Sequence, residues 1–197
     1  MNGLLKIENK VSFIKIDDGR YISLFPITKY DFERYIRERN TNIDYDSFLK
    51  KDKRISPQEI DNENINRIFI NKVNISWVKD YLNYMEEKMS KDIIVLLCSQ
   101  SDLANLEGYI QGNLELIIDS LQKTNDIDSR ISDCIKDEKI KSMILDNNFF
   151  TNLPQLISLP DSPGIAIKKG IKTIPLFGYE NAINMKEYDC SFRIILL

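Results

Sequence analysis

The chain has 197 residues, no histidine, and a formal net charge of -3 from 27 Lys and Arg against 30 Asp and Glu. The missing imidazole excludes Ser-His-Asp and Cys-His nucleophile pairs and histidine-ligated metal centres. The charge balance lacks the basic excess of nucleic-acid-binding proteins, so we expect no nucleic-acid partner.

The lack of a recognisable targeting signal and the spacing of the cysteines favour a cytoplasmic location. Residues 1–10 lack the apolar core of a signal peptide, and no apolar run approaches the roughly 18 residues of a membrane span. Cys98, Cys134 and Cys190 are odd in number and widely spaced, unlike a disulfide framework or a zinc site. We therefore expect a cytoplasmic protein with reduced thiols and no membrane partner.

Two strands and then a helix are predicted near the start of the chain. Apolar residues flank an Asp-Asp-Gly turn within residues 11–24, which is typical of two short strands. Thr28 and Asp31 have the spacing of a helix cap, in which the hydroxyl accepts from a backbone N–H and the acid suits the positive helix end. We expect this helix to run to about Arg39.

The middle of the chain predicts two more helices and a strand. Ser76 can cap a helix that starts at Trp77 and keeps its apolar residues on one face. A strand is predicted over residues 93–97, followed by a short capped helix over residues 99–109. Gly112-Asn113 is then expected to break the chain.

The last third predicts an insertion and a return to strands. An amphipathic helical insertion is expected at about residues 124–163, and its end, residues 147–163, is rich in proline and loop-like. The final predicted strands are residues 165–167, 174–177 and 192–197. Because strands and helices do not alternate regularly, we expect one α+β domain over residues 1–197, with mixed antiparallel strands, several helices and long irregular loops.

Five segments carry a family resemblance. They read FPITKYD, VNISWVKDY, VLLCSQSDL, GNLEL and CSFRI, and they begin at residues 25, 73, 95, 112 and 190. In this order they resemble motifs of the formylglycine-generating enzyme (sulfatase-modifying factor) family, over roughly residues 12–197. The resemblance implies a variant of the C-type lectin fold, with Ser99 and Asp102 at the positions of a Thr and a Glu that cap a family helix.

The catalytic residues that the resemblance implies are missing. Oxidase members of the family bind copper with a cysteine pair shortly before the terminal motif, but residues 174–189 contain no cysteine. One thiolate makes a poor copper site, and relatives with histidine-ligated iron have no counterpart in a chain without histidine. Cys190 stays open as a nucleophile or redox sensor, or as a half-buried structural thiol.

Three further residues are candidates for a site. The resemblance implies that Asn113 and Glu115 could hold calcium, a cation that prefers oxygen ligands. Alternatively, they satisfy a tight backbone turn by hydrogen bonds. Arg193 is expected to anchor the terminal strand, with substrate binding as the alternative, and Cys98 is expected to be a core thiol. Apart from calcium, no cofactor is expected.

Three functions remain open from the sequence. The first is a non-catalytic binding or scaffold module that contacts a protein or peptide through residues 126–146 and 147–164, since loops on a stable base commonly carry recognition. The second is a divergent enzyme that modifies a peptide or small molecule with carboxylates or Cys190. The third is a sugar-binding lectin-like module, whose usual calcium signature is absent.

Overall fold

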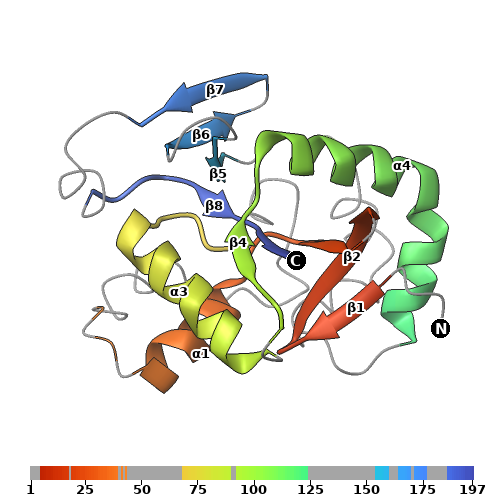
Figure 1. Cartoon of the computed structure of the whole chain (residues 1–197), viewed down its shortest axis with the longest axis horizontal. Coiled ribbons are helices and arrows are strands. Elements are labelled where there is room, and N and C mark those ends of the chain that lie inside the picture. Colours follow the sequence, from red (N-terminus) through yellow and green to blue (C-terminus); the bar gives the residue numbers. More distant parts are fainter. Residues whose placement is uncertain are drawn as a thin grey trace.

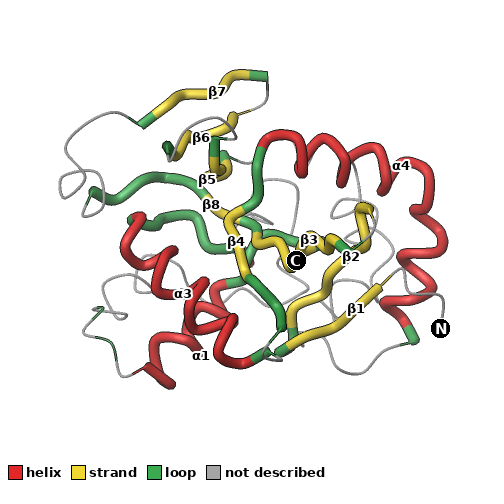
Figure 2. Tube along the Cα trace, viewed as in Figure 1, coloured by secondary structure: helices red, strands yellow, loops and turns green. Residues whose placement is uncertain are grey.

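Two β-sheets and three helices form the described part of the chain (Figures 1 and 2). The computed structural model describes residues 5–17, 19–39, 41, 43, 68–89, 92–123, 154–159, 164–169, 171–176 and 186–197. The expected contact segment over residues 126–146, and most of the expected helical insertion, lie outside these ranges.

The first sheet has five antiparallel strands in the order β1-β2-β3-β9-β4. Its strands are β1 (Leu5–Glu8), β2 (Val11–Asp17), β3 (Arg20–Ser23), β4 (Val95–Leu97) and β9 (Ile194–Leu196). The predicted pair within residues 11–24 is confirmed as β2 and β3. The sequence did not predict β1, which pairs with β2 through a turn at Asn9 and Lys10, both with positive φ.

The second sheet has four strands in the order β7-β6-β5-β8. Its strands are β5 (Gln155–Ser158), β6 (Ile165–Lys169), β7 (Lys172–Pro175) and β8 (Ser191–Phe192). Strand β5 corrects the sequence interpretation, because it lies within the stretch predicted to be the loop-like end of a helical insertion. Its residues pair with β6 and β8, contacts that no local propensity reveals.

The three helices start close to their predicted positions. They are α1 (Lys29–Arg39), α3 (Ile75–Lys88) and α4 (Gln100–Gln122). The Thr28 hydroxyl accepts from the Asp31 backbone N–H at 3.0 Å, which confirms the predicted cap. The predicted Ser76 cap is wrong, because the Asn74 side chain accepts from the Trp77 N–H at 2.9 Å and the helix begins at Ile75.

Helix α4 is longer than predicted. The expected break at Gly112-Asn113 is present as a kink, where Asn113 has the non-helical angles φ −133° and ψ 19° and helical residues lie on both sides. The Asn113 side-chain amide donates to the Tyr109 carbonyl at 3.0 Å, which satisfies a backbone oxygen at the kink. Apolar residues beyond the kink, such as Ile117 and Leu121, are buried and continue the helix. The local signal therefore identified the interruption, and tertiary packing explains why a helical segment follows it.

Helices cover the two faces of the first sheet. On one face, Ile110 and Ile117 of α4 pack in the same core cluster as Ile14 and Ile22 of the sheet. On the other face, α1 and α3 pack against the sheet in a second cluster rich in aromatic rings, and Figure 1 shows these two helices side by side. Each strand can supply both clusters because successive side chains point to opposite faces.

The C-terminal segment joins the two sheets. Strand β8 pairs with β5 in the second sheet, and one residue later β9 lies between β3 and β4 in the first sheet. Arg193 is that connecting residue. It is fully buried, and it donates a hydrogen bond to the Gln155 side-chain oxygen. The described architecture confirms the α+β class with largely antiparallel strands, while the C-type lectin variant stays a prediction.

Candidate functional site

Cys190 is a buried thiol in the cluster between the first sheet, α1 and α3. Burial raises the pKa of Cys190 to about 12, and the neighbouring Asp189 charge adds to this increase. A thiol with this pKa is almost entirely protonated at neutral pH, whereas the thiolate is the nucleophile and metal ligand. The structure therefore places Cys190 where a core residue is expected.

Cys98 has the same character on the opposite side of the first sheet. It is fully buried, and burial raises its pKa to about 12 even though the Arg193 charge acts in the opposite direction. Both Cys98 and Cys190 are free thiols. Their burial leaves neither positioned to attack a substrate in solvent.

We predict that alkylation will show this protection. At pH 8, iodoacetamide should modify Cys98 and Cys190 about a thousandfold more slowly in the native protein than in urea, because a pKa near 12 leaves only about one thiol in ten thousand ionised. Peptide mass spectrometry can follow each cysteine separately. Rapid native labelling of Cys190 at its unfolded rate would instead indicate an accessible, reactive thiol.

Asn113 and Glu115, the calcium candidates, lie in the long helix α4. The Asn113 side-chain nitrogen donates to the Tyr109 carbonyl at the kink, and Glu115 is exposed. No group of three or more acidic or cysteine side chains in the described ranges is arranged to hold a metal. Calcium binding therefore stays a prediction.

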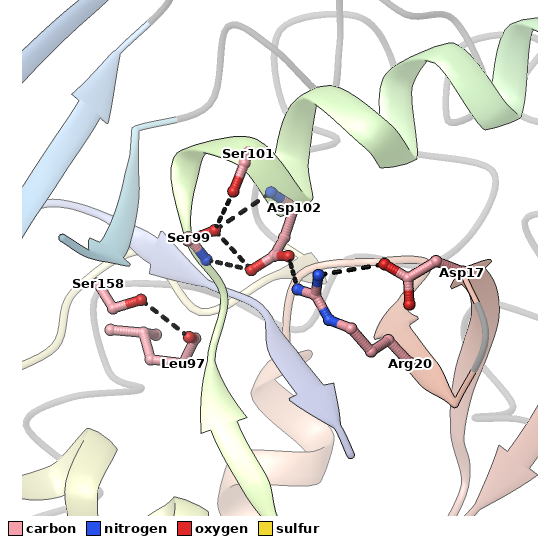
Figure 3. Close-up of polar contacts among 7 residues, drawn as sticks. All are labelled: Asp17, Arg20, Leu97, Ser99, Ser101, Asp102 and Ser158. Atoms are coloured by element: carbon pink, nitrogen blue, oxygen red, sulfur yellow. Dashed lines mark hydrogen bonds and ion pairs between the residues drawn. The ribbon is translucent and has the colours of Figure 1, made fainter. Parts of the chain in front are cut away.

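The N-terminus of α4 is the centre of a connected set of polar contacts (Figure 3). The Asp102 carboxylate accepts from the Ser99 backbone N–H and from the Ser99 hydroxyl, both at 2.7 Å. The Ser99 hydroxyl in turn accepts from the Asp102 N–H at 3.2 Å, which confirms the predicted capping box. The sequence did not predict that Arg20 forms an ion pair with the buried Asp102 carboxylate and another with Asp17 at 3.1 Å.

These contacts fix the position of the first turn of α4. The Asp102 carboxylate accepts hydrogen bonds from three donors: the Ser99 backbone N–H, the Ser99 hydroxyl and the Arg20 guanidinium. The second sheet is also fixed here, because the Ser158 hydroxyl donates to the Leu97 carbonyl at 3.2 Å. The cluster therefore holds the start of α4 close to both sheets.

The β6–β7 hairpin, residues 165–175, presents a different surface, which we call the basic hairpin. Ile171 at its turn is 97% exposed and Ile174 is 53% exposed. Lys168, Lys169 and Lys172 lie on the hairpin, and the sequence has no Asp or Glu between residues 162 and 179. In a chain of net charge -3, this hairpin is a local positive region with exposed apolar side chains.

Sequence reasoning placed the contact surface elsewhere, at residues 126–146 and 147–164. The first stretch lies outside the described residues, and part of the second forms the central strand β5. One signal could have identified the basic hairpin: two short apolar strands flank a Lys-Gly-Ile-Lys turn in an acid-free stretch. The exposure of Ile171, however, is a property of the folded molecule alone.

Comparison with known proteins leaves the chain without an assigned family. No protein family, curated protein or solved structure matches it. In the parts of the chain that the structure describes, no helix has both the length and the apolar character needed to cross a membrane. The formylglycine-generating enzyme resemblance therefore continues to rest on its five sequence motifs.

Proposed function

We propose that this protein is a non-catalytic binding module that acts through protein or peptide contacts, and that the basic hairpin is its contact surface. The observation that carries the proposal is the 97% exposure of Ile171, the most exposed large apolar side chain among the described residues. Burying such a side chain against a partner gains about 2 kcal/mol. Ile174 extends the apolar surface along the same hairpin.

A single exposed apolar side chain is common on protein surfaces and does not by itself indicate a contact surface. Here two isoleucines occur together with three lysines on the edge strand β7, its neighbour β6 and the turn between them, and Figure 1 shows β7 at the periphery of the molecule. A partner surface with apolar side chains and the opposite charge would complement both features of this hairpin. The hairpin is also attached to a rigid core, which lowers the entropy lost on binding.

The proposal includes the family and the compartment. We propose a divergent formylglycine-generating-enzyme-like domain of the cytoplasm that has lost the copper-binding cysteine pair, and the burial of Cys190 supports the loss of that chemistry. The protein or peptide contact then replaces catalysis as the function of the fold. Purified protein that retains stoichiometric copper or iron would overturn this part of the proposal.

A matched pair of variants tests the contact surface. The protein and its Ile171→Ser and Leu116→Ser variants would each be immobilised and used for quantitative affinity capture from an extract of the source cells. Leu116 is the control because it is 58% exposed on α4, away from the hairpin. We expect Ile171→Ser to weaken binding of the captured partner about tenfold or more, as a loss of 1.4 kcal/mol or more requires.

The Leu116→Ser control should bind that partner with unchanged affinity. Equal capture by all three proteins would show that the basic hairpin is not the contact surface. Circular dichroism of the three proteins should be the same, because both substituted side chains lie in solvent and contribute little to folding.

A further inference from the structure

The register of the basic hairpin places two lysines side by side. Lys169 pairs directly with Lys172, and Ile167 pairs with Ile174, so these four side chains share one face. Directly opposed residues in antiparallel strands have Cβ atoms about 5 Å apart, and like charges at this distance are mutually destabilising. In the described part of the chain, neither Lys169 nor Lys172 has a carboxylate within ion-pair distance.

Near the turn, the lysine face is exposed to solvent. The opposite face of the hairpin carries Ala166, which is fully buried in the core, and Thr173, whose hydroxyl donates to the Gln100 side-chain oxygen at 3.0 Å. That face therefore packs toward the start of α4. Lys169, Lys172 and Ile174 are exposed, whereas Ile167 on the same face packs against the second core cluster.

Apolar side chains flank the lysine pair at both ends. Ile171 lies at the turn beyond the pair, and Ile174 lies on the other side of it, about 10 Å along an extended chain from Ile171. A complementary ligand has a negative charge at its centre and an apolar side chain on each side. We infer that the partner of the basic hairpin presents an acidic protein segment in which a carboxylate lies between two apolar side chains, an inference that rests on the proposed function.

An anionic membrane fits this order of groups less well. A membrane-inserting hairpin needs its apolar residues beyond its cations, so that the cations lie at the headgroups. Here only Ile171 lies beyond the lysine pair, and Ile174 would remain on the water side of the headgroups. One isoleucine is too little apolar surface for stable insertion, whereas both isoleucines can contact a protein segment.

Side chains, rather than backbone strand pairing, make this contact. The Leu176 N–H donates to the Ile165 carbonyl at 2.9 Å, so Thr173 and Pro175 direct their backbone toward the open edge of β7. Pro175 has no N–H, which leaves Thr173 as the single outward donor in the strand. An edge with one donor is a poor template for an added strand.

The first test uses defined peptides. Three capped peptides with glycine ends would carry Leu-Ser-Glu-Ser-Leu, the same sequence with Gln for Glu, and the same sequence with Lys for Glu. In this pattern both leucines and the central residue share one face of an extended chain. We expect the Glu peptide to shift backbone amide NMR signals of the basic hairpin and to bind about tenfold more tightly than the Gln peptide.

The affinity for the Glu peptide should fall as ionic strength rises from about 0.05 M to about 0.5 M, because salt screens exposed charges. Equal binding of the Glu and Lys peptides would overturn the inference. Binding of phosphatidylserine-containing vesicles without any response to the Glu peptide would also overturn it and would indicate a membrane surface instead.

The second test separates this inference from the proposed function. Lys169→Gln/Lys172→Gln would be compared with Lys88→Gln/Lys123→Gln, a variant of equal net charge whose lysines form exposed ion pairs elsewhere. We expect only the hairpin variant to lose binding of the captured partner, by about tenfold. If Ile171→Ser weakens capture and the hairpin lysine variant does not, the contact surface stands and the acidic partner is excluded.

Discussion

Replacing Phe192 with alanine should lower the free energy of unfolding by about 3–5 kcal/mol. The ring is fully buried and packs edge-on against Tyr81 at 5.5 Å and Phe32 at 6.4 Å between centroids. Its backbone carbonyl also accepts from the Ile27 N–H at 3.0 Å. The substitution thus leaves a cavity where α1, α3 and both sheets meet.

Urea unfolding followed by circular dichroism measures this loss as a lower midpoint with an unchanged slope. Leu116→Ala is the control, because its exposed side chain on α4 should change stability by less than about 0.5 kcal/mol. A small domain is stabilised by only about 5–15 kcal/mol, so the Phe192 variant should lose a large share of its stability and melt at a lower temperature. A change below about 1 kcal/mol would contradict the central position of this ring.

Asp102→Ala should have the second largest effect, about 2–3 kcal/mol. The variant loses the acceptor for the Ser99 backbone N–H and hydroxyl, and it leaves Arg20 with only the exposed Asp17 carboxylate as an ion-pair partner. The loss exceeds that of a simple helix cap because the Asp102 side chain is almost completely buried. The start of α4 should therefore loosen from the first sheet.

Asp119→Ala provides the matched control. Asp119 lies on the same helix but is exposed, and it forms an i,i+4 ion pair with Lys123, which is worth about 0.5 kcal/mol or less. Hydrogen exchange of α4 amides would locate the effect: protection should fall in the first turns of the helix in Asp102→Ala and remain unchanged in Asp119→Ala. Equal losses in both variants would show that Asp102 acts as an ordinary surface charge.

The helix starts show where sequence reasoning succeeds. The caps at Thr28 and Ser99 were predicted because they depend on two side chains three residues apart, whose hydrogen bonds are local. The cap at Asn74 was missed because Asn and Ser are both good capping residues, and Ser76 stands nearer the first large apolar residue, Trp77. Local chemistry identified the helix but not which of two nearby polar residues caps it.

The candidate site shows where sequence reasoning ends. The sequence offered Cys190, Asn113 and Glu115, and the structure places the first in the core and the other two along α4. The exposed Ile171 and the opposed lysines Lys169 and Lys172 could not be recognised until the register of β6 and β7 was known. Exposure and cross-strand pairing depend on distant contacts rather than on neighbouring residues.

The sequence by itself determined the absence of imidazole chemistry, the α+β class and the starts of two helices. Composition can be read directly from the sequence, and helix caps depend on hydrogen bonds between residues close together in the chain. Only the tertiary structure decided that β5 is a strand, that α4 continues past Asn113, and that the C-terminal segment connects two sheets. These features depend on which distant side chains become buried together. Burial is a collective property of the folded chain, so it determines element lengths and exposed surfaces that local patterns leave open.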